Sequence, residues 1–531
     1  MNWRYHLVTV FSLAVLAVGV TWLHKVDEAR AFLATRPSFS LVDGRITLRE
    51  HFSGKYLNGK KVGYTLMRLQ QDTQGDAYYR SHVESQFSLS VLGQEVRFSQ
   101  IADATLHKDL SLQSLHSVFR TVQAQDTVTT ATVKGPVLEI ANRSMDQVTR
   151  QTKNTGGAVY TLEALYPLIM QRGLRPGAML AVKIFEPTLG DLVDVTVRVI
   201  GPRSVWHRGE PVAATLVEID VLGTTQRSWL RKDGSPAVEE TSMGGLAMVG
   251  VEEPAADAPN LARSHLEYWR FDSVVPAGKA IEDLFTSTLI DSNVRFARAE
   301  EVFSATYRLI DVPEGSFLDG GERQTLVGSS SPERMLKLRV ESPAYEALAA
   351  RVTESYRLGQ DLSDRFADEL ASSLRIQSEH PDIRRTAREI VGEEIDPYRA
   401  ALKIHHWLAD EAHIRKEIRA TLPDALEVLA TRSGDCNEHA VLFAALGRAV
   451  GLPTKMVTGI VYSPDLGKFG YHAWNEVLIG LAPPTWYALD ATLDQTRVDA
   501  THIKIAEGDI DQQVKIVPLV GKMKLYVEGY D

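Results

Sequence analysis

The stretch Gly434-Asp435-Cys436-Asn437-Glu438-His439-Ala440 contains the only cysteine among the 531 residues of the chain. A loop turns into a helix here: Ser433 or Asp435 caps a helix that runs to about residue 450 and stops at Gly451-Leu452-Pro453. Unpaired backbone N–H groups and the helix dipole favour negative charge at the start of a helix. The sequence therefore places the Cys436 thiol where its reactive thiolate form is stabilised.

Two further polar residues follow, each on a different predicted strand. His472 begins a strand predicted for residues 472–479, and Asp490 ends the next one, at residues 486–490. A thiol, an imidazole and a carboxylate in this order are what a Cys-His-Asp catalytic triad requires, with the carboxylate holding the imidazole ring and selecting its tautomer. Cys436, His472 and Asp490 are the candidate catalytic residues. Asp494, four residues on, is a second carboxylate that must be told apart from Asp490.

These blocks strongly resemble the bacterial transglutaminase-like superfamily. The resemblance rests on the stretch around Cys436, on Tyr471-His472-Ala473-Trp474-Asn475-Glu476-Val477 and on Leu489-Asp490-Ala491-Thr492, and Asp499-Ala500-Thr501-His502 agrees with it. It covers roughly residues 374–527, under a third of the chain. It implies a papain-like core in which a helix carrying the thiol packs on an antiparallel sheet carrying base and acid. By position it assigns the nucleophile, base and acid to the three residues named above.

The resemblance does not settle the reaction, because the family includes glutamine–lysine cross-linkers, peptidases and amide hydrolases. All begin with thiolate attack on an amide carbonyl to form an acyl-thioester. We expect a cysteine protease or amidase, or a transglutaminase-like acyltransferase, that acts on a protein or peptide substrate without a cofactor. The short polar stretch at residues 463–470 is typical of an open cleft rim and favours hydrolysis.

Two other classes of function remain open. The first is a non-catalytic envelope binding or scaffold protein with a vestigial transglutaminase-like domain, although all three catalytic residue types are intact. The second is a zinc enzyme that would combine Cys436 and His439 with further histidines. Zinc sites need compact ligand pairs at recognised spacings, and only Cys436-x-x-His439 has one. We therefore expect no metal.

Two tryptophans are candidates for places beside the triad. Trp474, two residues after His472, is expected to shield the triad from water. Trp407 has two interpretations: it lies near an oxyanion site, as a tryptophan upstream of the cysteine does in animal members of the family, or it packs in the core. Its position on the apolar face of a helix that starts at Asp396-Pro397 favours core packing.

The first half of the chain has a different pattern. Apolar residues alternate with polar ones, as in Val193, Val195, Val197 and Val199, which is typical of half-buried antiparallel strands. The overall class is α+β. We expect a β-rich domain at residues 35–251, a curved antiparallel sheet or half-barrel that holds a short helix near residues 160–171. A small mixed α/β segment at residues 260–350 and the transglutaminase-like catalytic domain at residues 374–531 follow.

Charge and the N-terminus bear on partners and location. The formal net charge is −10 and no basic stripe is present, which argues against nucleic-acid binding. Residues 7–23 (LVTVFSLAVLAVGVTWL) are uncharged and long enough for a membrane anchor within the segment 1–30. A cleavable signal with its site near Ala17-Val18-Gly19 is the alternative. We expect a single-pass protein of the bacterial inner membrane whose body faces the periplasm.

Overall fold

The structure is a computed structural model, and the residues it describes are 39–42, 45–57, 59–72, 77–91, 94–121, 124–144, 147–173, 175–207, 209–232, 234–243, 246–255, 257, 288–312, 323–330, 334–417, 424–509, 516 and 519–531. The predicted N-terminal anchor at residues 7–23 lies outside them. Among the described residues, no helix is both long enough and apolar enough to cross a membrane. The described residues fall into two compact units, one within residues 14–284 and one within residues 285–531.

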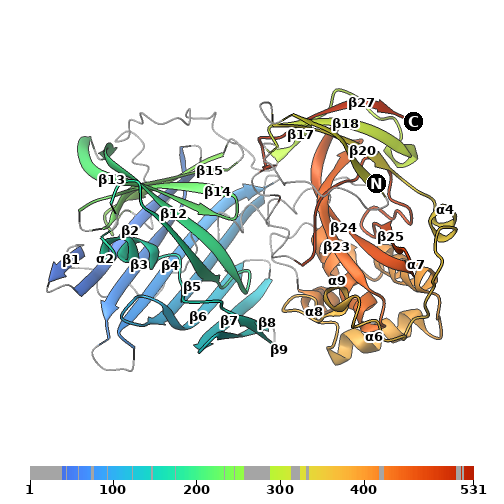
Figure 1. The fold of residues 1–531 in the computed structure, drawn as a ribbon, viewed down its shortest axis with the longest axis horizontal. Coiled ribbons are helices and arrows are strands. Elements are labelled where there is room, and N and C mark those ends of the chain that lie inside the picture. Colours follow the sequence, from blue (N-terminus) through green and yellow to red (C-terminus); the bar gives the residue numbers. More distant parts are fainter. Residues whose placement is uncertain are drawn as a thin grey trace. The chain divides into compact units, whose positions relative to one another are not determined.

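The first unit is a single 16-stranded sheet (Figure 1). Its strands, in chain order, are β1 (Phe39–Val42), β2 (Arg45–Leu57), β3 (Lys60–Gln71), β4 (Tyr79–Val91), β5 (Gln94–Leu106), β6 (Leu112–Thr121), β7 (Ala124–Lys134), β8 (Val137–Ser144), β9 (Gln147–Asn154), β10 (Val159–Tyr160), β11 (Met179–Glu186), β12 (Asp191–His207), β13 (Glu210–Val221), β14 (Thr224–Leu230), β15 (Pro236–Met243) and β16 (Leu246–Glu252).

Pairing in this sheet follows the chain, because short hairpin turns join most successive strands. Strands β2 to β9 pair in order, and β10 to β16 do the same; β16 then returns to pair with β2, with Met248 opposite Leu57. The strand pairs are antiparallel apart from the two-residue pair of β10 and β11. A β-rich region before the transglutaminase-like part of the chain is therefore confirmed.

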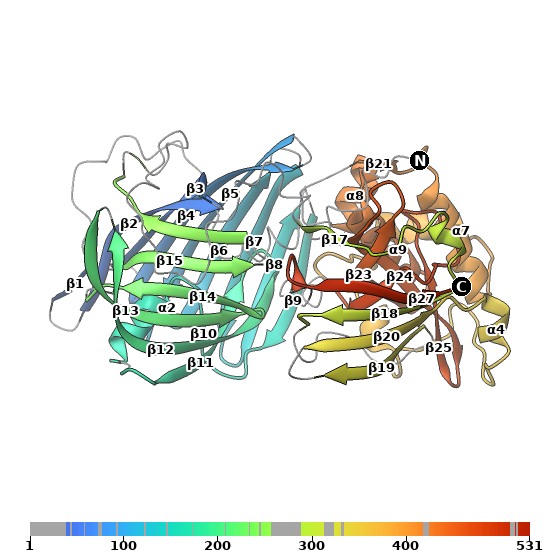
Figure 2. The same ribbon diagram turned by 90° about the horizontal axis from the view of Figure 1, so that it is seen from above.

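The alternation of valines predicted half-buried strands, and β12 confirms it. Val195, Val197 and Val199 are each no more than 1% exposed, whereas Asp194, directly before them in the strand, is exposed. The sheet curves strongly, and helix α2 (Leu165–Gln171) lies inside the curve (Figure 2). The Tyr166 hydroxyl on α2 donates a hydrogen bond to Glu239 Oε1 on β15 at 2.5 Å. The predicted curved sheet holding a helix is thus present.

A prediction from the same kind of alternation is wrong for one polar residue of β4. The alternation of Val83 and Phe87 with Glu84 and Gln86 predicts that Glu84 lies on the solvent side, but Glu84 is buried and its Oε1 accepts a hydrogen bond from the Tyr64 hydroxyl at 3.0 Å. A buried carboxylate is tolerated when it is paired. Another buried carboxylate of this unit, Glu239, is paired with a charge: its Oε2 lies 2.8 Å from Lys55 Nζ.

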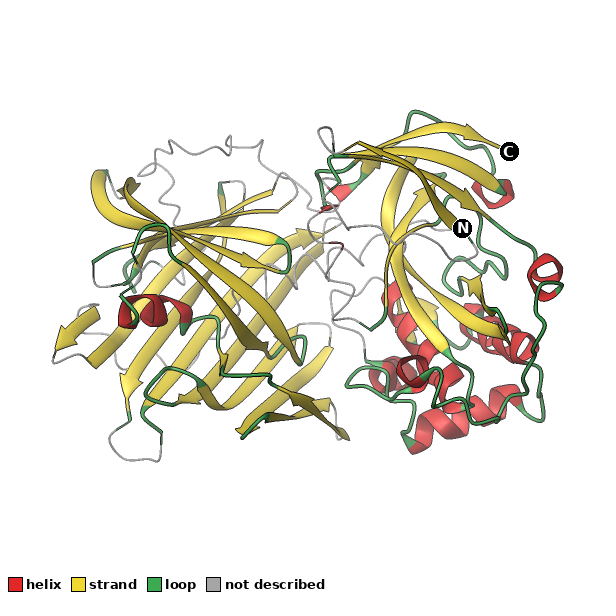
Figure 3. Ribbon diagram, viewed as in Figure 1, coloured by secondary structure: helices red, strands yellow, loops and turns green. Residues whose placement is uncertain are grey.

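The described part of the second unit contains two main sheets, a short two-stranded pair and a layer of helices (Figure 3). One sheet has the order β17-β24-β23-β26 with β25 beside β24, and the other has the order β19-β20-β18-β27. Their strands are β17 (Ile290–Asp291), β18 (Ser304–Ile310), β19 (Gln324–Ser330), β20 (Met335–Glu341), β23 (Thr454–Ser463), β24 (Lys468–Leu481), β25 (Pro484–Leu489), β26 (Ile503–Glu507) and β27 (Lys524–Tyr530). The strands β18 to β20, from the segment set apart at residues 260–350, therefore share a sheet with the last strand of the chain.

The helices of this unit are α4 (Tyr345–Ala349), α5 (Ala367–Leu370), α6 (Pro381–Val391), α7 (Pro397–Ala409), α8 (Ala425–Thr431) and α9 (Cys436–Ala449), and a two-residue pair joins β21 (Arg415–Lys416) to β22 (Ser433–Gly434). Asp396 caps α7 as expected, by accepting the Arg399 N–H at 2.9 Å. Helix α9 is buried along almost its whole length and packs in one core with α6, α7, α8 and β24. Gly447 permits this packing, because a Cβ there would lie 2.5 Å from Thr454 Oγ1.

Candidate active site

Helix α9 begins at Cys436, where the sequence predicted it. Asp435 is the N-cap, and its carboxylate accepts the Asn437 N–H at 3.0 Å. Glu438 reaches back to accept the Asp435 N–H at 3.0 Å, so the two side chains form a capping box. Two of the helix's unpaired donors are satisfied in this way, and the start of the helix is held rigidly. The Cys436 thiol lies on this first turn and is fully buried.

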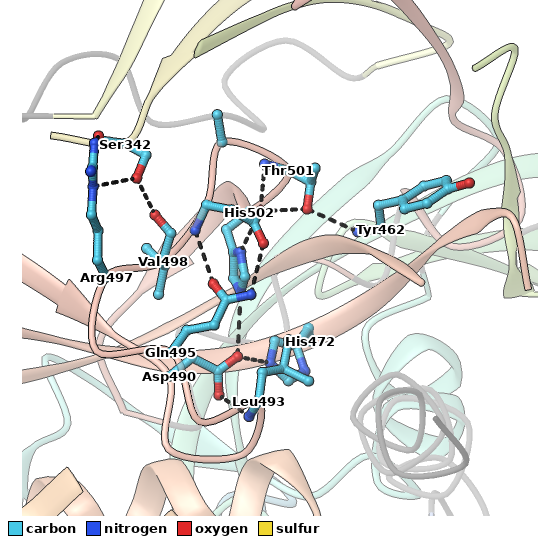
Figure 4. A network of polar contacts seen from close by, with 12 residues as sticks. Ser342, Tyr462, His472, Asp490, Leu493, Gln495, Arg497, Val498, Thr501 and His502 are labelled. Atoms are coloured by element: carbon cyan, nitrogen blue, oxygen red, sulfur yellow. Dashed lines mark hydrogen bonds and ion pairs between the residues drawn. The ribbon is translucent and has the colours of Figure 1, made fainter. Parts of the chain in front are cut away.

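His472 and Asp490 meet through the hairpin of β24 and β25. The two strands pair antiparallel, with Asn475 opposite Leu489, so His472 on β24 lies near the residue that follows β25. His472 Nε2 and Asp490 Oδ2 are 2.6 Å apart, and both side chains are fully buried (Figure 4). The other carboxylate oxygen of Asp490 accepts the backbone N–H groups of Thr492 and Leu493 at 2.8 and 3.1 Å. The turn after β25 therefore fixes the carboxylate against the imidazole.

The start of α9 lies beside this pair. Asn475 Nδ2, three residues after His472 on β24, donates a hydrogen bond to the Ala440 carbonyl of α9 at 3.0 Å. One turn after Cys436, burial lowers the pKa of His439 to about 4, and the charges of Asp490 and His472 also act on it. The helix that Cys436 begins and the His472–Asp490 pair are thus neighbours in one buried region.

A second imidazole, from His502 before β26, contacts the same carboxylate. Its Nε2 lies 3.2 Å from Asp490 Oδ2, and its Nδ1 lies 3.1 Å from Asp499 Oδ1. Burial favours a raised pKa for Asp490, but the two imidazoles oppose it and hold the pKa well below its ordinary value. His502 ends the stretch Asp499-Ala500-Thr501-His502, which agrees with the family resemblance but did not predict a role for this histidine. The one signal for it was the spacing Asp499-x-x-His502, which brings an acid and an imidazole together across a turn.

Trp474 covers the two imidazoles, as expected. Its ring is stacked on that of His472, with centroids 6.3 Å apart at 22°, and meets the His502 ring edge-on at 5.2 Å. Gly459 on β23 is opposite His472 in the sheet. A Cβ at Gly459 would lie 2.0 Å from the Ile503 carbonyl oxygen and 2.7 Å from the Trp474 ring. Glycine is therefore required where three strands and the indole converge.

The remaining sequence candidates lie in other contacts. Asp494 is exposed and its Oδ1 lies 3.2 Å from His405 Nε2, so the carboxylate that holds His472 is Asp490. Trp407 is stacked on His413 with centroids 4.8 Å apart, and the Arg432 guanidinium lies 5.0 Å from its ring centre. These contacts, at the edge of the helical core, agree with packing.

Two groups of described side chains bring possible metal ligands within 4.8 Å of one another: His405, His406 and Asp494, and His472, Asp490 and His502. In the second group, His472 Nε2 and His502 Nε2 are both within hydrogen-bond distance of Asp490 Oδ2. Neither group contains the Cys436-x-x-His439 pair, and His439 Nδ1 lies 2.7 Å from the Asp435 carbonyl.

We predict that Gly459→Ala destabilises the second unit by about 1–3 kcal/mol, because the added methyl group overpacks the junction of β23, β26 and Trp474. Urea unfolding of the purified chain measures the change. The matched control is Gly529→Ala on β27, where a Cβ would have no atom within 4 Å, and its effect should stay within about 0.5 kcal/mol. Small and equal effects of the two substitutions would contradict the tight packing behind His472.

Comparisons with solved structures give partial, low-scoring matches. A candidate cysteine protease from Cytophaga hutchinsonii is 17% identical, with 43% of this chain and 86% of that chain covered and a TM-score of 0.28. A β-barrel-like protein of the domain of unknown function DUF1849 from Brucella abortus is 12% identical, with 38% and 94% covered and a TM-score of 0.30. A candidate protease from Parabacteroides distasonis is 12% identical, with 71% and 68% covered and a TM-score of 0.18.

The comparison with protein families is more specific. No curated protein matches the chain. Residues 384–491 match the profile of the transglutaminase-like superfamily, a range that runs from α6 to the residue after Asp490 and includes Cys436 and His472. This chain therefore carries a transglutaminase-like superfamily domain at residues 384–491.

Proposed function

We propose that this protein is a cysteine-dependent enzyme that acts on amide bonds of a peptide or protein through an acyl-thioester at Cys436. The observation that carries the proposal is the buried bond of 2.6 Å between His472 Nε2 and Asp490 Oδ2, beside the helix that begins with the thiol. An imidazole held by a carboxylate next to a cysteine at a helix start is the arrangement that activates a thiol.

The roles follow from the two ring nitrogens of His472. Because Asp490 engages Nε2, Nδ1 is the nitrogen that takes the proton of the Cys436 thiol. The thiolate attacks the amide carbonyl carbon, the C–S bond forms and the C–N bond breaks, and His472 returns the proton to the leaving amine. A water molecule, activated by His472, then attacks the thioester; the C–S bond breaks and releases the acid and the free thiol.

Burial shapes how such a site works. Cys436, His472 and Asp490 are each fully buried, and their interactions are stronger in a water-poor environment than at the surface. A peptide therefore has to displace part of the cover to reach Sγ. The stretch at residues 463–470, predicted to be an open cleft rim, forms the turn and strand ends of the hairpin between β23 and β24, and this position does not by itself favour hydrolysis over amine transfer. The preference for hydrolysis instead rests on effective concentration: an amine competes with water only if it is bound next to the thioester.

The test is to incubate the purified chain with envelope-derived peptides and a labelled primary amine, and to measure free acid, free amine and label incorporated. We expect release of acid to exceed incorporation, and Cys436→Ser to abolish both. Asp490→Asn should lower the rate by about 10²–10⁴-fold, because an amide no longer selects the imidazole tautomer. The matched control, Asp494→Asn, removes a carboxylate that contacts His405 and should retain activity.

Three results would overturn parts of this proposal. Turnover that survives Cys436→Ser would exclude the thiol as nucleophile. A non-catalytic scaffold protein purified together with a contaminating enzyme would give this result. Activity that a chelator removes, together with stoichiometric zinc in the purified protein, would favour the metal enzyme. Incorporation of amine far above release of acid would retain the acyl-thioester and replace hydrolysis by cross-linking.

We further propose that residues 7–23 tether the body to the inner membrane and that the body faces the periplasm. The support is the uncharged, apolar run in the sequence. Fractionation of cells should leave the full chain in the membrane pellet until detergent is added, whereas a chain without residues 1–30 should be released. External protease should digest the body in spheroplasts. A full chain that is soluble without detergent, or a body protected from protease, would contradict the tether or the orientation.

A further inference from the structure

His502 lies between two carboxylates, and this determines its charge. Its Nε2 is 3.2 Å from Asp490 Oδ2 and its Nδ1 is 3.1 Å from Asp499 Oδ1. A neutral imidazole has one ring nitrogen that can only accept a hydrogen bond, and a carboxylate oxygen is also only an acceptor. Both contacts are therefore made well only when both nitrogens carry a proton. His502 is fully buried, so this cation is held inside the protein.

The hydrogen bonds that Asp499 accepts favour its ionised form, which pairs with this cation. Its Oδ1 accepts hydrogen bonds from the N–H and the hydroxyl of Thr501 at 2.7 and 2.6 Å, and its Oδ2 accepts one from Gln495 Nε2 at 2.8 Å. Burial opposes ionisation of Asp499, but His502 and these donors lower its pKa. Burial likewise opposes the charge on His502, and Asp499 and Asp490 together raise its pKa. Both shifts agree with the hydrogen-bond geometry.

Among the residues that the structure describes, two further charged or titratable groups lie near this ring or its partner Asp499. His472 on β24 lies with its ring centre 5.8 Å from that of His502. Arg323, before β19, donates to the Asp499 backbone carbonyl at 2.6 Å and lies behind Asp499. Trp474 adds an uncharged face. Within the described part of the chain, the carboxylates of Asp490 and Asp499 are the charges in direct contact with His502, with His472 across the shared carboxylate and Arg323 on the backbone of Asp499.

Asp490 consequently serves two imidazoles with one oxygen. Oδ2 accepts from His472 at 2.6 Å and from His502 at 3.2 Å. We propose that His502 is a positioning residue for the reaction at Cys436: its cation fixes the Asp490 carboxylate toward His472 and takes up part of its negative charge. The inference rests on the proposed function. As a consequence, Asp490 stabilises protonated His472 less than it would in a triad without the His502 cation. His472 then passes its proton to the leaving amine more readily.

The experiment is nuclear magnetic resonance of the full chain labelled with ¹⁵N only in its histidines, with His472 and His502 assigned from single substitutions. In the parent protein both ring nitrogens of His502 should still carry protons at pH values well above the ordinary histidine pKa of about 6.5. A neutral His502 at neutral pH would overturn the inference, and the protonation state itself is measured in the parent protein.

Two variants then test the effect on His472. His502→Gln keeps a donor for Asp490 but removes the charge, and Asp499→Asn removes the carboxylate that keeps Nδ1 of His502 protonated. In each, the pH at which His472 loses its proton should rise by about 1 unit, because a neighbouring positive charge has been removed. An unchanged His472 titration in both variants would contradict the inference.

The control separates charge from structure. Ser342→Ala removes the hydroxyl that donates to the Val498 carbonyl at 2.7 Å, which loosens the same loop without changing its charges. It should lower the melting temperature and leave the His472 titration as in the parent; an equal shift would show that His502 acts only through loop structure. A parent protein that forms no acyl-thioester would defeat the proposed function, whereas an active parent with an unshifted His472 would defeat this inference alone.

Discussion

The buried contact between His472 and Asp490 is the constraint on which the second unit depends. Two ionisable groups without solvent are stable only when each has partners of complementary charge or hydrogen-bonding type. Asp490 therefore has every acceptor position used: two backbone N–H groups of the following turn, and two imidazoles. Asp490 therefore needs three elements in place at the same time: the turn after β25, the β24–β25 hairpin and the loop that carries His502.

The packing around the pair follows from the same constraint. Excluding water requires close cover, which Trp474 provides on the imidazoles, and close cover requires the absence of a side chain at Gly459. On the helical side, α9 must approach the sheet closely for its first turn to lie near the pair, and Gly447 allows that approach. The capping box of Asp435 and Glu438 then fixes where the helix begins. The position of the Cys436 thiol is thus set by backbone geometry as well as by its own side chain.

Local patterns predicted much of this. Caps and period-two alternation depend on neighbouring residues, so Asp435, Asp396 and the valines of β12 could be assigned from sequence alone. Glu84 was misassigned because its burial depends on a hydroxyl from another strand. For His502 the spacing Asp499-x-x-His502 was the one signal, and its contact with Asp490 could not be predicted, because the two residues meet only in the folded chain. The stretch 463–470 is a hairpin turn, and because polarity and glycine are shared by cleft edges and hairpin turns, its pattern could not distinguish the two.

The state of the thiol tests the central claim most directly. The chain has one cysteine, so the difference in ultraviolet absorbance between the parent and Cys436→Ser reports its thiolate alone and needs no reagent to enter the buried site. We predict that the thiolate forms well below the ordinary cysteine pKa of about 8.5 and that His472→Ala moves its formation to higher pH. A thiolate that appears only near that ordinary value, and is unaffected by His472→Ala, would contradict the account.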